Sequence, residues 1–169
     1  MKIHQGKLKS PIGDLSIFVS DKGLKKICWD RDLEDAPWER WFPDSEEIIW
    51  NTKHTHLIST KEQLTAYFKK RLTTFRLPFD LKGTPFQKKV WQKLEKIPFG
   101  QTRSYQQLAI AIGNEKAVRA VGNANGRNPA PIIIPCHRVI KKNGNIGGYS
   151  GGIHIKDWLL AHEGIILEK

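Results

Sequence analysis

The sequence lacks the features that mark disulfide-stabilised, secreted and membrane-spanning proteins. Its 169 residues include only two cysteines, Cys28 and Cys136, too few for a disulfide framework and typical of free thiols in a reducing compartment. No apolar run is long enough to cross a membrane, and the N-terminus carries polar residues every few positions, unlike a secretion signal. We therefore expect a cytoplasmic protein without membrane association, and each cysteine needs its own explanation.

Acidic residues are scarce in the second half of the chain. Residues 1–80 hold 14 Lys and Arg against 12 Asp and Glu, a surplus of +2, whereas residues 81–169 hold 14 against 5, a surplus of +9, which together give +11. Solubility alone would account for several of these side chains, such as Lys88 and Lys89, but it accounts less well for the asymmetry. The basic half therefore favours an anionic partner, with nucleic acid as the first choice.

The first half of the chain has the alternating pattern of a small antiparallel sheet. Alternation within residues 3–29, interrupted at Asp21-Lys22-Gly23, predicts a hairpin. Residues 30–56 are irregular and predict a long loop, with one short strand near residues 47–50. A capping-box pattern begins at Thr60 and predicts a helix from there, which would cover the sheet.

The second half predicts three short helices separated by tight turns. Gly83-Thr84-Pro85 combines a flexible residue, an N-cap and a proline suited to the first helical position. We therefore divide the chain into domains 1–83 and 84–169. Ser104 caps a second helix, and Asn114 caps a third over residues 115–124, which is rich in small side chains. The three short helices, the last of which has small side chains and carries Arg119, are a helix-turn-helix candidate, although a plain helical core would explain the small side chains equally well.

An apolar run ends at a proline and then places a thiol beside an imidazole. An isolated buried cysteine would be inert. Here Pro135 interrupts the expected strand at Cys136, and His137 can accept the thiol proton and so leave the reactive thiolate. Adjacent side chains of a strand point to opposite faces, so this pairing needs a bent backbone or a bridging water. Glu163 is one of few carboxylates in this half and is the expected partner of the imidazole, although it could be an ordinary acidic residue near a helix end.

Glycines surround Tyr149 and Ser150 in the segment after the cysteine. Such a loop lets a flat ligand approach backbone donors closely. A flexible connection to the final helix is an equally good explanation of the glycines.

Taken together, these motifs resemble the O6-alkylguanine-DNA alkyltransferases, also called methylated-DNA-protein-cysteine methyltransferases. The resemblance rests on four blocks: Arg119-Ala120-Val121-Gly122, Asn128-Pro129, Pro135-Cys136-His137-Arg138-Val139 and Gly148-Tyr149-Ser150-Gly151-Gly152. It covers essentially all of residues 84–164, whereas before residue 83 only the segment from Ser10 to Leu15 and the strand pattern resemble the family. It implies an α+β fold, with a small N-terminal antiparallel sheet, ribonuclease H-like, plus a helix, and a C-terminal winged helix-turn-helix-like alkyltransferase domain.

The resemblance also implies a role for each matching residue. Cys136 would be the nucleophile and alkyl acceptor, activated through a water by His137, which Glu163 holds. Asn128 would tie the recognition helix to the active-site strand, and Tyr105 would assist guanine as the leaving group. The other matches would contact DNA or the extruded base: Arg119 as a finger that fills the space left by the base, Ala120 and Ala124 as small side chains facing the groove, and Val139, Tyr149, Ser150 and Gly151 as the pocket.

The implied function is DNA repair in a single turnover. An alkyl group on O6 of guanine points into the base stack, so the nucleotide must be flipped out before sulfur can reach it. The product is a thioether that thiol exchange cannot reverse, so the enzyme would act once and need no cofactor. The implied partner is double-stranded DNA, bound through the minor groove, that contains O6-alkylguanine or O4-alkylthymine. We expect a monomer, associated with the nucleoid in a prokaryote.

Structural zinc is not expected in this chain. Some relatives hold zinc in the N-terminal domain through two cysteines and two histidines. This half has only Cys28, so we predict no metal site despite His54 and His56.

Three other functions fit the sequence less well. A cysteine hydrolase using Cys136, His137 and Glu163 would need an oxyanion hole, and adjacent Cys and His differ from common peptidase arrangements. A methyltransferase that uses S-adenosylmethionine would need a glycine loop between an early strand and helix, which the sequence lacks. A pure DNA-binding module predicts that Cys136→Ala leaves function intact.

Overall fold

The structure, a computed structural model, describes residues 1–34, 38–43 and 47–168. The chain divides into two compact units, Met1–Lys82 and Gly83–Lys169, a division that falls one residue before the predicted one. Within the described ranges, no helix has both the length and the apolar character that a membrane span requires.

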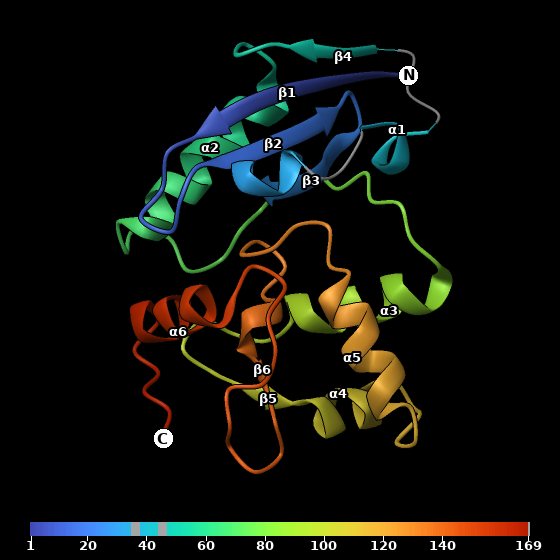
Figure 1. Cartoon of the computed structure of the whole chain (residues 1–169), viewed down its shortest axis with the longest axis vertical. Coiled ribbons are helices and arrows are strands. Elements are labelled where there is room, and N and C mark those ends of the chain that lie inside the picture. Colours follow the sequence, from blue (N-terminus) through green and yellow to red (C-terminus); the bar gives the residue numbers. More distant parts are fainter. Residues whose placement is uncertain (35–37, 44–46, 169) are drawn as a thin grey trace. The chain divides into compact units, whose positions relative to one another are not determined.

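The first unit is built on a four-stranded sheet with the order β3-β2-β1-β4 (Figure 1). Three strands, β1 (Lys2–Leu8), β2 (Leu15–Ser20) and β3 (Gly23–Trp29), pair antiparallel, as the alternating pattern predicts. The short strand expected near residues 47–50 is β4 (Glu47–Trp50), and it joins β1 in parallel. Every residue of β2 is buried, because this central strand has neighbours on both edges and cover on both faces.

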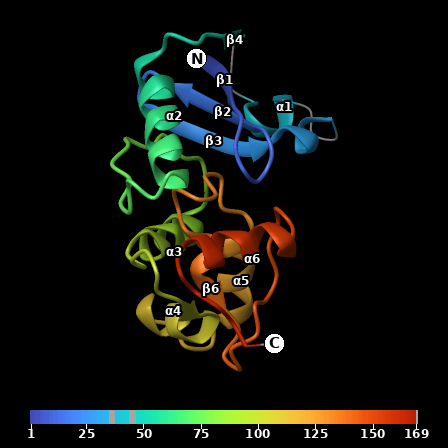
Figure 2. The same ribbon diagram turned by 90° about the vertical axis from the view of Figure 1, so that its left-hand side faces the viewer.

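Helical segments cover both faces of the sheet. α2 (Thr55–Phe68) runs along one face (Figure 2), where a Cβ on Gly6 would lie only 2.6 Å from Cδ2 of Leu57. Ile3 is three residues from Gly6 and so points to the opposite face. On that face lie η1 (Asp30–Leu33) and α1 (Trp38–Trp41). The buried cluster there consists of Ile3, Phe18, Cys28 and Phe42, with Leu33, Trp41 and Ile48 packed against it.

Two sequence predictions for this unit need correction. α2 begins at Thr55 rather than after Thr60, and its N-cap is His54, whose Nδ1 accepts a hydrogen bond from the backbone N–H of His56 at 3.3 Å. Thr60 is buried inside the helix, where its hydroxyl donates to the carbonyl oxygen of His56 at 2.7 Å. The pattern misled because a threonine within a helix can satisfy its hydroxyl on the preceding turn.

The loop predicted over residues 30–56 is only partly correct. It contains η1 and α1 as well as β4. Residues 35–37 and 44–46 of that segment lie outside the described residues.

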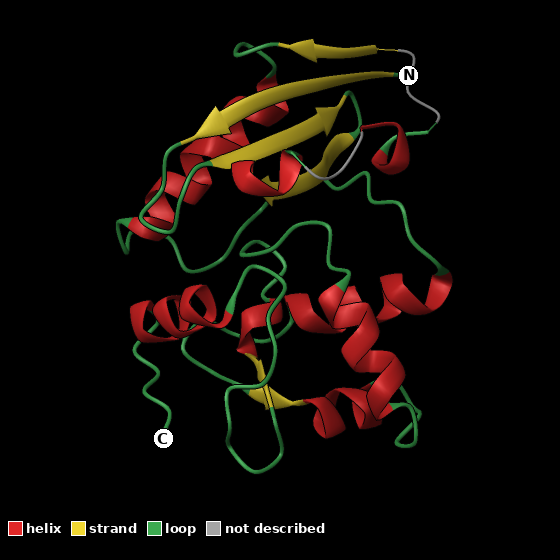
Figure 3. Ribbon diagram, viewed as in Figure 1, coloured by secondary structure: helices red, strands yellow, loops and turns green. Residues whose placement is uncertain are grey.

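Helices make up most of the regular structure of the second unit, and long loops connect them (Figure 3). α3 (Pro85–Glu95), α4 (Tyr105–Ala111) and α5 (Val118–Gly126) pack on one another. α6 (Ile153–His162) packs against the short helix η2 (Cys136–Arg138), and the strands β5 (Arg103–Ser104) and β6 (Val139–Ile140) pair in parallel. The two units together have the expected α+β fold.

Side-chain caps define the starts of α3 and α4 as predicted. Thr84 accepts a hydrogen bond from the backbone N–H of Gln87 at 3.1 Å, and the Gln87 side chain accepts one from the backbone of Thr84 at 2.9 Å. Ser104 and Gln107 form the same reciprocal pair at the start of α4. Each pair satisfies two N–H groups that the first turn of a helix leaves without partners.

The predicted start of the third helix is wrong. α5 runs over Val118–Gly126, not over residues 115–124, and its N-cap residue makes no side-chain cap. Asn114 instead accepts a hydrogen bond from the backbone N–H of Ala117 at 3.1 Å through its carbonyl oxygen. It closes a turn before the helix, a role that asparagine fills as readily as that of a cap.

Candidate active site

The segment that delivers Cys136 is a proline-rich turn, not the expected strand. Pro131 and Ile134 form only an isolated bridge, and the N–H of Ile134 donates to the carbonyl oxygen of Ala130 at 2.9 Å. Ile132 has φ of 76°, a conformation that a β-branched residue rarely adopts and that costs on the order of 1–3 kcal/mol. The surrounding contacts must therefore hold this turn in place.

Asn128 supplies the contacts that hold the turn. Its Nδ2 donates to the carbonyl oxygen of Ile134 at 2.7 Å, and its Oδ1 accepts from the N–H of Ala130 at 2.9 Å. Asn128 lies just beyond the end of α5, so it links that helix to the segment before the cysteine. The predicted tie exists, but it holds a turn rather than a strand.

Cys136 opens η2 and lines a cavity of about 450 Å³. The residue is only 2 % exposed, and its backbone N–H donates to the carbonyl oxygen of Ile134 at 2.8 Å. The cavity is within the size range of about 300–1,000 Å³ typical of sites for small molecules. Its walls include three predicted residues, Tyr105, Tyr149 and Ser150, together with Gly122, Asn125, Gly126, Lys141 and Gly148. The thiol therefore lies at the wall of a site rather than sealed in the core.

Opposing effects act on the thiol of Cys136. Burial is the largest and raises its pKa, because a charged sulfur is poorly solvated there. Hydrogen bonding from Asn128, the charge of Lys156 and hydrogen bonding from Tyr149 act in the other direction and favour the thiolate. The neighbours of Cys136 are thus those expected around a sulfur that must become negative.

His137 and Glu163 form a buried pair beside this cysteine. Nε2 of His137 lies 2.8 Å from Oε1 of Glu163, and neither side chain is exposed to solvent. On a strand, Cys136 and His137 would point to opposite faces of the sheet. Both residues lie in the 3-10 turn η2, so that alternation does not apply to them. The expected contact between His137 and Glu163 is present, but the expected strand at Cys136 is a 3-10 turn.

Arg138 binds the same carboxylate in a bidentate manner. Its Nε and one terminal nitrogen each donate to Glu163 at 2.8 Å, and the other terminal nitrogen donates to the carbonyl oxygen of Ile97 at 2.6 Å. The backbone N–H of Gly100 donates to Glu163 at 3.3 Å. Glu163, at the C-cap of α6, is thus a buried carboxylate that accepts hydrogen bonds from several groups, and not a surface carboxylate.

The electrostatics around Glu163 determine the protonation state of the imidazole. Burial alone would raise the pKa of Glu163, but hydrogen bonds and charges from His137 and Arg138 outweigh it and hold the pKa at about 2. The carboxylate is therefore ionised at neutral pH and can only accept, so Nε2 of His137 carries the proton. Burial also lowers the pKa of His137, which keeps the ring neutral and leaves a lone pair on Nδ1. No described residue forms a hydrogen bond to that Nδ1.

Lys156 is a buried residue near Cys136 that was not among the predicted site residues. Its Nζ donates to the carbonyl oxygens of Val139 at 2.6 Å and Gly148 at 3.1 Å, and the residue has no exposed surface. Burial lowers its pKa to about 8, and the nearby Cys136 opposes that shift. A lysine within the apolar stripe of Ile155, Leu159 and Leu160 on α6 was the signal that could have revealed it.

The remaining predicted pocket residues have mixed surroundings. Tyr105 is half-buried at the start of α4, and burial, followed by the charge of Cys136, raises its pKa. Gly151 is buried, and so is Val139, whose carbonyl oxygen already accepts from Lys156. The carbonyl group of Val139 is therefore already engaged within the protein.

The predicted DNA-contacting face of α5 divides into an exposed and a buried part. Arg119 and Ala120 are exposed, and Arg119 does not line the cavity. Ala124 is only 2 % exposed, and its carbonyl oxygen accepts a hydrogen bond from Nε1 of Trp91 at 2.9 Å. Ala124 therefore belongs to the packing of α5 on α3 rather than to a surface for DNA. The prediction was wrong because small side chains occur on both faces of this helix, so periodicity did not distinguish the buried face from the exposed one.

Both units match families of known proteins. Residues 85–165 match the DNA binding domain of 6-O-methylguanine DNA methyltransferase, and residues 3–81 match its ribonuclease-like domain. The constitutive methylated-DNA-protein-cysteine methyltransferase of Bacillus subtilis (strain 168) is 45 % identical over 161 residues, 93 % of this chain and 93 % of that protein. This chain belongs to the methylated-DNA-protein-cysteine methyltransferase family. A further methyltransferase of that name, from Methanosarcina acetivorans, is 42 % identical over 156 residues, 92 % of this chain and 95 % of the relative.

Solved structures of methyltransferases share the fold of this chain. Mycobacterium tuberculosis OGT in complex with DNA matches with a TM-score of 0.83 and 40 % identity, over 95 % of this chain and 93 % of that one. The resemblance first carried by residues 84–164 is therefore confirmed. It extends to the N-terminal unit, where the ribonuclease-like match bears out the expected fold.

Proposed function

We propose that this methyltransferase repairs alkylated double-stranded DNA by moving the alkyl group from O6 of an extruded guanine to Sγ of its own Cys136. One observation carries the proposal: the buried Cys136 lines a cavity of about 450 Å³. Beside that cysteine, a neutral imidazole is held by an ionised carboxylate. A nucleophile, a base and room for a flat ligand thus come together in one place.

His137 acts as the base in this proposal. Its Nδ1 bears a lone pair, is buried and has no hydrogen-bond partner among the described residues, so a water between it and Cys136 would satisfy both groups. Such a water would pass the thiol proton to Nδ1, while Glu163 stabilises the imidazolium through Nε2. Lys156 favours the resulting thiolate through its charge.

The transfer itself is an in-line displacement at the alkyl carbon. A bond forms between Sγ and that carbon, the bond from carbon to O6 breaks, and the electron pair of that bond goes to the guanine. The proton that the thiol loses is balanced by the proton that the guanine gains. Tyr105 lines the same cavity and would assist this leaving group. The thioether cannot be reversed by thiol exchange, so each molecule acts once and needs no cofactor.

The DNA contact is assigned to the minor groove and to α5. Arg119 and Ala120 are exposed on this helix, and the small side chain of Ala120 suits a narrow groove. Arg119 would fill the space that the extruded nucleotide leaves. The basic surplus of residues 81–169, +9, would contribute contacts to phosphate and favour association with the nucleoid. That Mycobacterium tuberculosis OGT was solved in complex with DNA supports this partner.

We extend the proposal to O4-alkylthymine, which carries its alkyl group on a comparable exocyclic oxygen and is smaller than guanine. All residues of the site come from the second unit of a single chain, which supports action as a monomer. Residues 84–169 are thus the DNA-binding and alkyl-acceptor domain, and residues 1–83 are assigned a supporting role.

The proposal is tested with duplex DNA that contains O6-methylguanine labelled in its methyl group. The label should move from DNA to protein, and it should stay in the DNA when Cys136→Ala replaces the wild type. Unmodified DNA in excess should slow the transfer only through competition for binding. Release of the label as a small molecule, or transfer by Cys136→Ala, would contradict it.

A further inference from the structure

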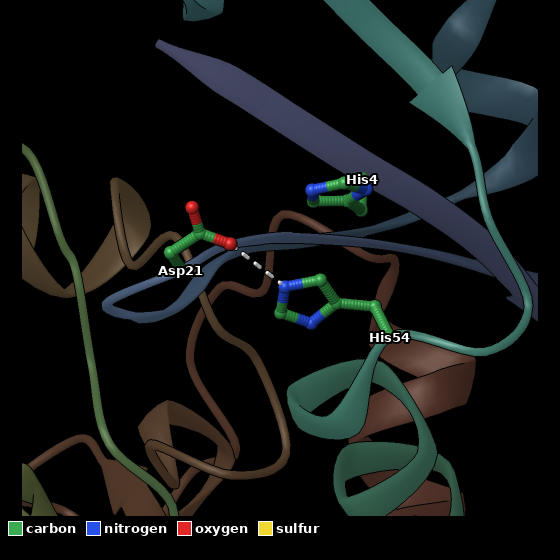
Figure 4. Close-up of side chains that lie close together, drawn as sticks. All are labelled: His4, Asp21 and His54. Atoms are coloured by element: carbon green, nitrogen blue, oxygen red, sulfur yellow. Dashed lines mark hydrogen bonds and ion pairs between the residues drawn. The ribbon is translucent and has the colours of Figure 1, made fainter.

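Three potential metal ligands meet in the first unit, which contains no residue of the Cys136 site. They are His4 in β1, Asp21 in the turn between β2 and β3, and His54 at the N-cap of α2. The atoms with which they could bind an ion all lie within 4.8 Å of one another. Figure 4 shows the two rings and the carboxylate directed toward a common point.

The distances are close to those that a bound ion requires. A tetrahedral zinc ion with ligands at about 2.0–2.2 Å separates its ligand atoms by roughly 3.4 Å. Nε2 of His54 and Oδ1 of Asp21 are already 3.2 Å apart. The ligand atom of His4 lies within 4.8 Å of both of them. The longest separation among the three ligand atoms, at most 4.8 Å, exceeds the zinc value by about 1.4 Å, so His4 and its partners would have to approach one another by roughly that distance. The side chain of Asp21 is 87 % exposed and has room to move.

The surroundings orient the ligands. Nδ1 of His4 contacts the side-chain amide of Asn51 at 3.2 Å, which leaves Nε2 for an ion. Histidines that bind metals usually have such a second partner on the other nitrogen. Nε2 of His56 donates to the carbonyl oxygen of Asp21 at 3.1 Å and so holds the turn against the start of α2.

We propose that His4, Asp21 and His54 bind a zinc ion, with solvent at its remaining position. Two imidazoles and one carboxylate are a donor set that zinc accepts, and the site has no thiolate that would select a softer ion. The single cysteine of this half predicted no metal, whereas this site uses no cysteine. Its ligands also differ from the two cysteines and two histidines of zinc-binding relatives.

An ion at this position would join three elements of the sheet unit. It would connect β1, the turn after β2 and the start of α2, segments that are far apart in the sequence. Binding at Nε2 places the ring proton of His54 on Nδ1, so the 3.3 Å contact with the N–H of His56 would be exchanged for the metal bond. The ion therefore stabilises the folded unit by mass action, more strongly at higher zinc concentration.

Zinc titration of the full chain, followed by calorimetry, tests the proposal. Wild type and Cys136→Ala should each bind one zinc ion per chain, because the acceptor cysteine is not a ligand. Asp21→Asn should bind zinc at least tenfold more weakly, and its exposed position makes loss of the fold unexpected. Asp32→Asn, which removes another acidic side chain of the same unit that is not among the proposed ligands, should bind like wild type.

The absorption spectrum of bound cobalt identifies the donors independently of alkyl transfer. Cobalt in this site should show the bands of nitrogen and oxygen ligands without charge transfer from sulfur, and His4→Gln should abolish them. Full zinc affinity in Asp21→Asn, or loss of binding in Cys136→Ala, would overturn the proposal. Neither result depends on whether the chain repairs DNA, so the failure of one proposal is distinguishable from that of the other.

Discussion

His137 and Glu163, 26 residues apart in the chain, are joined by a hydrogen bond of 2.8 Å between Nε2 and Oε1, with both side chains fully buried. Because Arg138 and His137 hold the pKa of Glu163 at about 2, the carboxylate is ionised and the ring proton lies on Nε2. The free lone pair of Nδ1 is then the base of the site. A single contact thus fixes the tautomer on which the proposed activation of Cys136 depends.

Glu163→Gln should reduce both the rate of transfer and the stability of the fold. Transfer from O6-methylguanine DNA should slow by about 10²-fold or more, because the imidazolium loses its stabilising charge. The free energy of unfolding should fall by about 3–5 kcal/mol, since Arg138 is left as a buried charge without its partner. Single-turnover kinetics and urea denaturation measure the two effects.

A double variant separates these two roles. Arg138→Met combined with Glu163→Gln removes the unpaired charge, so it should recover part of the lost stability but none of the lost rate. If the rate recovers together with stability, Glu163 acts only through folding and not through His137.

Lowering the pH should reduce the free energy of unfolding over a pH range that the titration of Glu163 determines. Its pKa is about 2 in the folded chain against an ordinary value of 4.5, so the unfolded chain binds this proton more readily. The contribution of Glu163 is complete above about pH 4.5 and is lost as the pH falls toward 2, a change of about 3 kcal/mol. Other carboxylates titrate in the same pH range. The measurement is therefore the difference in unfolding free energy between wild type and Glu163→Gln across that range. A difference that stays constant with pH would contradict this assignment.

Lys156→Met should make Cys136 harder to ionise. The substitution removes a positive charge that lowers the pKa of Cys136, so its titration should move to higher pH. Transfer at neutral pH should slow by about 10²-fold, the usual cost of one electrostatic group in an active site. The pH dependence of thiol alkylation reports the titration directly. Lys142→Met, an exposed lysine outside the cavity lining, is the matched control, and an equal effect in both variants would argue against a local role.

Arg119→Ala should separate DNA handling from chemistry. Arg119 is exposed on α5 and does not line the cavity, so the fold and the pocket should be unaffected. The rate of transfer from duplex DNA should fall by about tenfold or more. This corresponds to a loss of roughly 1.4 kcal/mol in the stabilisation of the extruded nucleotide. Reaction with free O6-methylguanine base should continue at the wild-type rate. Arg127→Ala removes an equal charge just beyond the same helix and should have a smaller effect on duplex DNA.

The sequence predicted features governed by local chemistry. Alternation within residues 3–29 located the antiparallel hairpin, and Thr84 and Ser104 located two helix starts, where each forms a reciprocal pair with Gln87 or Gln107. These signals act over a few residues and need no tertiary context. The helix starts predicted from Thr60 and Asn114 were wrong because such local signals are ambiguous. Threonine can also satisfy its hydroxyl inside a helix, and asparagine also occurs in turns.

The site was harder to predict because its parts depend on packing. The motif around Cys136 identified the family, but three prolines and the positive φ of Ile132 turn the expected strand into a bend that only the fold makes visible. Arg138 was known as a neighbour of the thiol, yet its bidentate bond to Glu163 depends on how α6 packs against η2. The pattern of residues along the chain does not reveal that packing.

The most direct test counts and locates the methyl groups on the protein. Wild-type protein is incubated with increasing amounts of O6-methylguanine duplex, and its intact mass and peptides are then measured. Transfer should stop at one methyl group per chain, on the peptide that contains Cys136, while Cys28, whose pKa burial raises to about 12, stays unmodified. Continued turnover beyond one equivalent, or a methyl group at any other residue, would contradict the account.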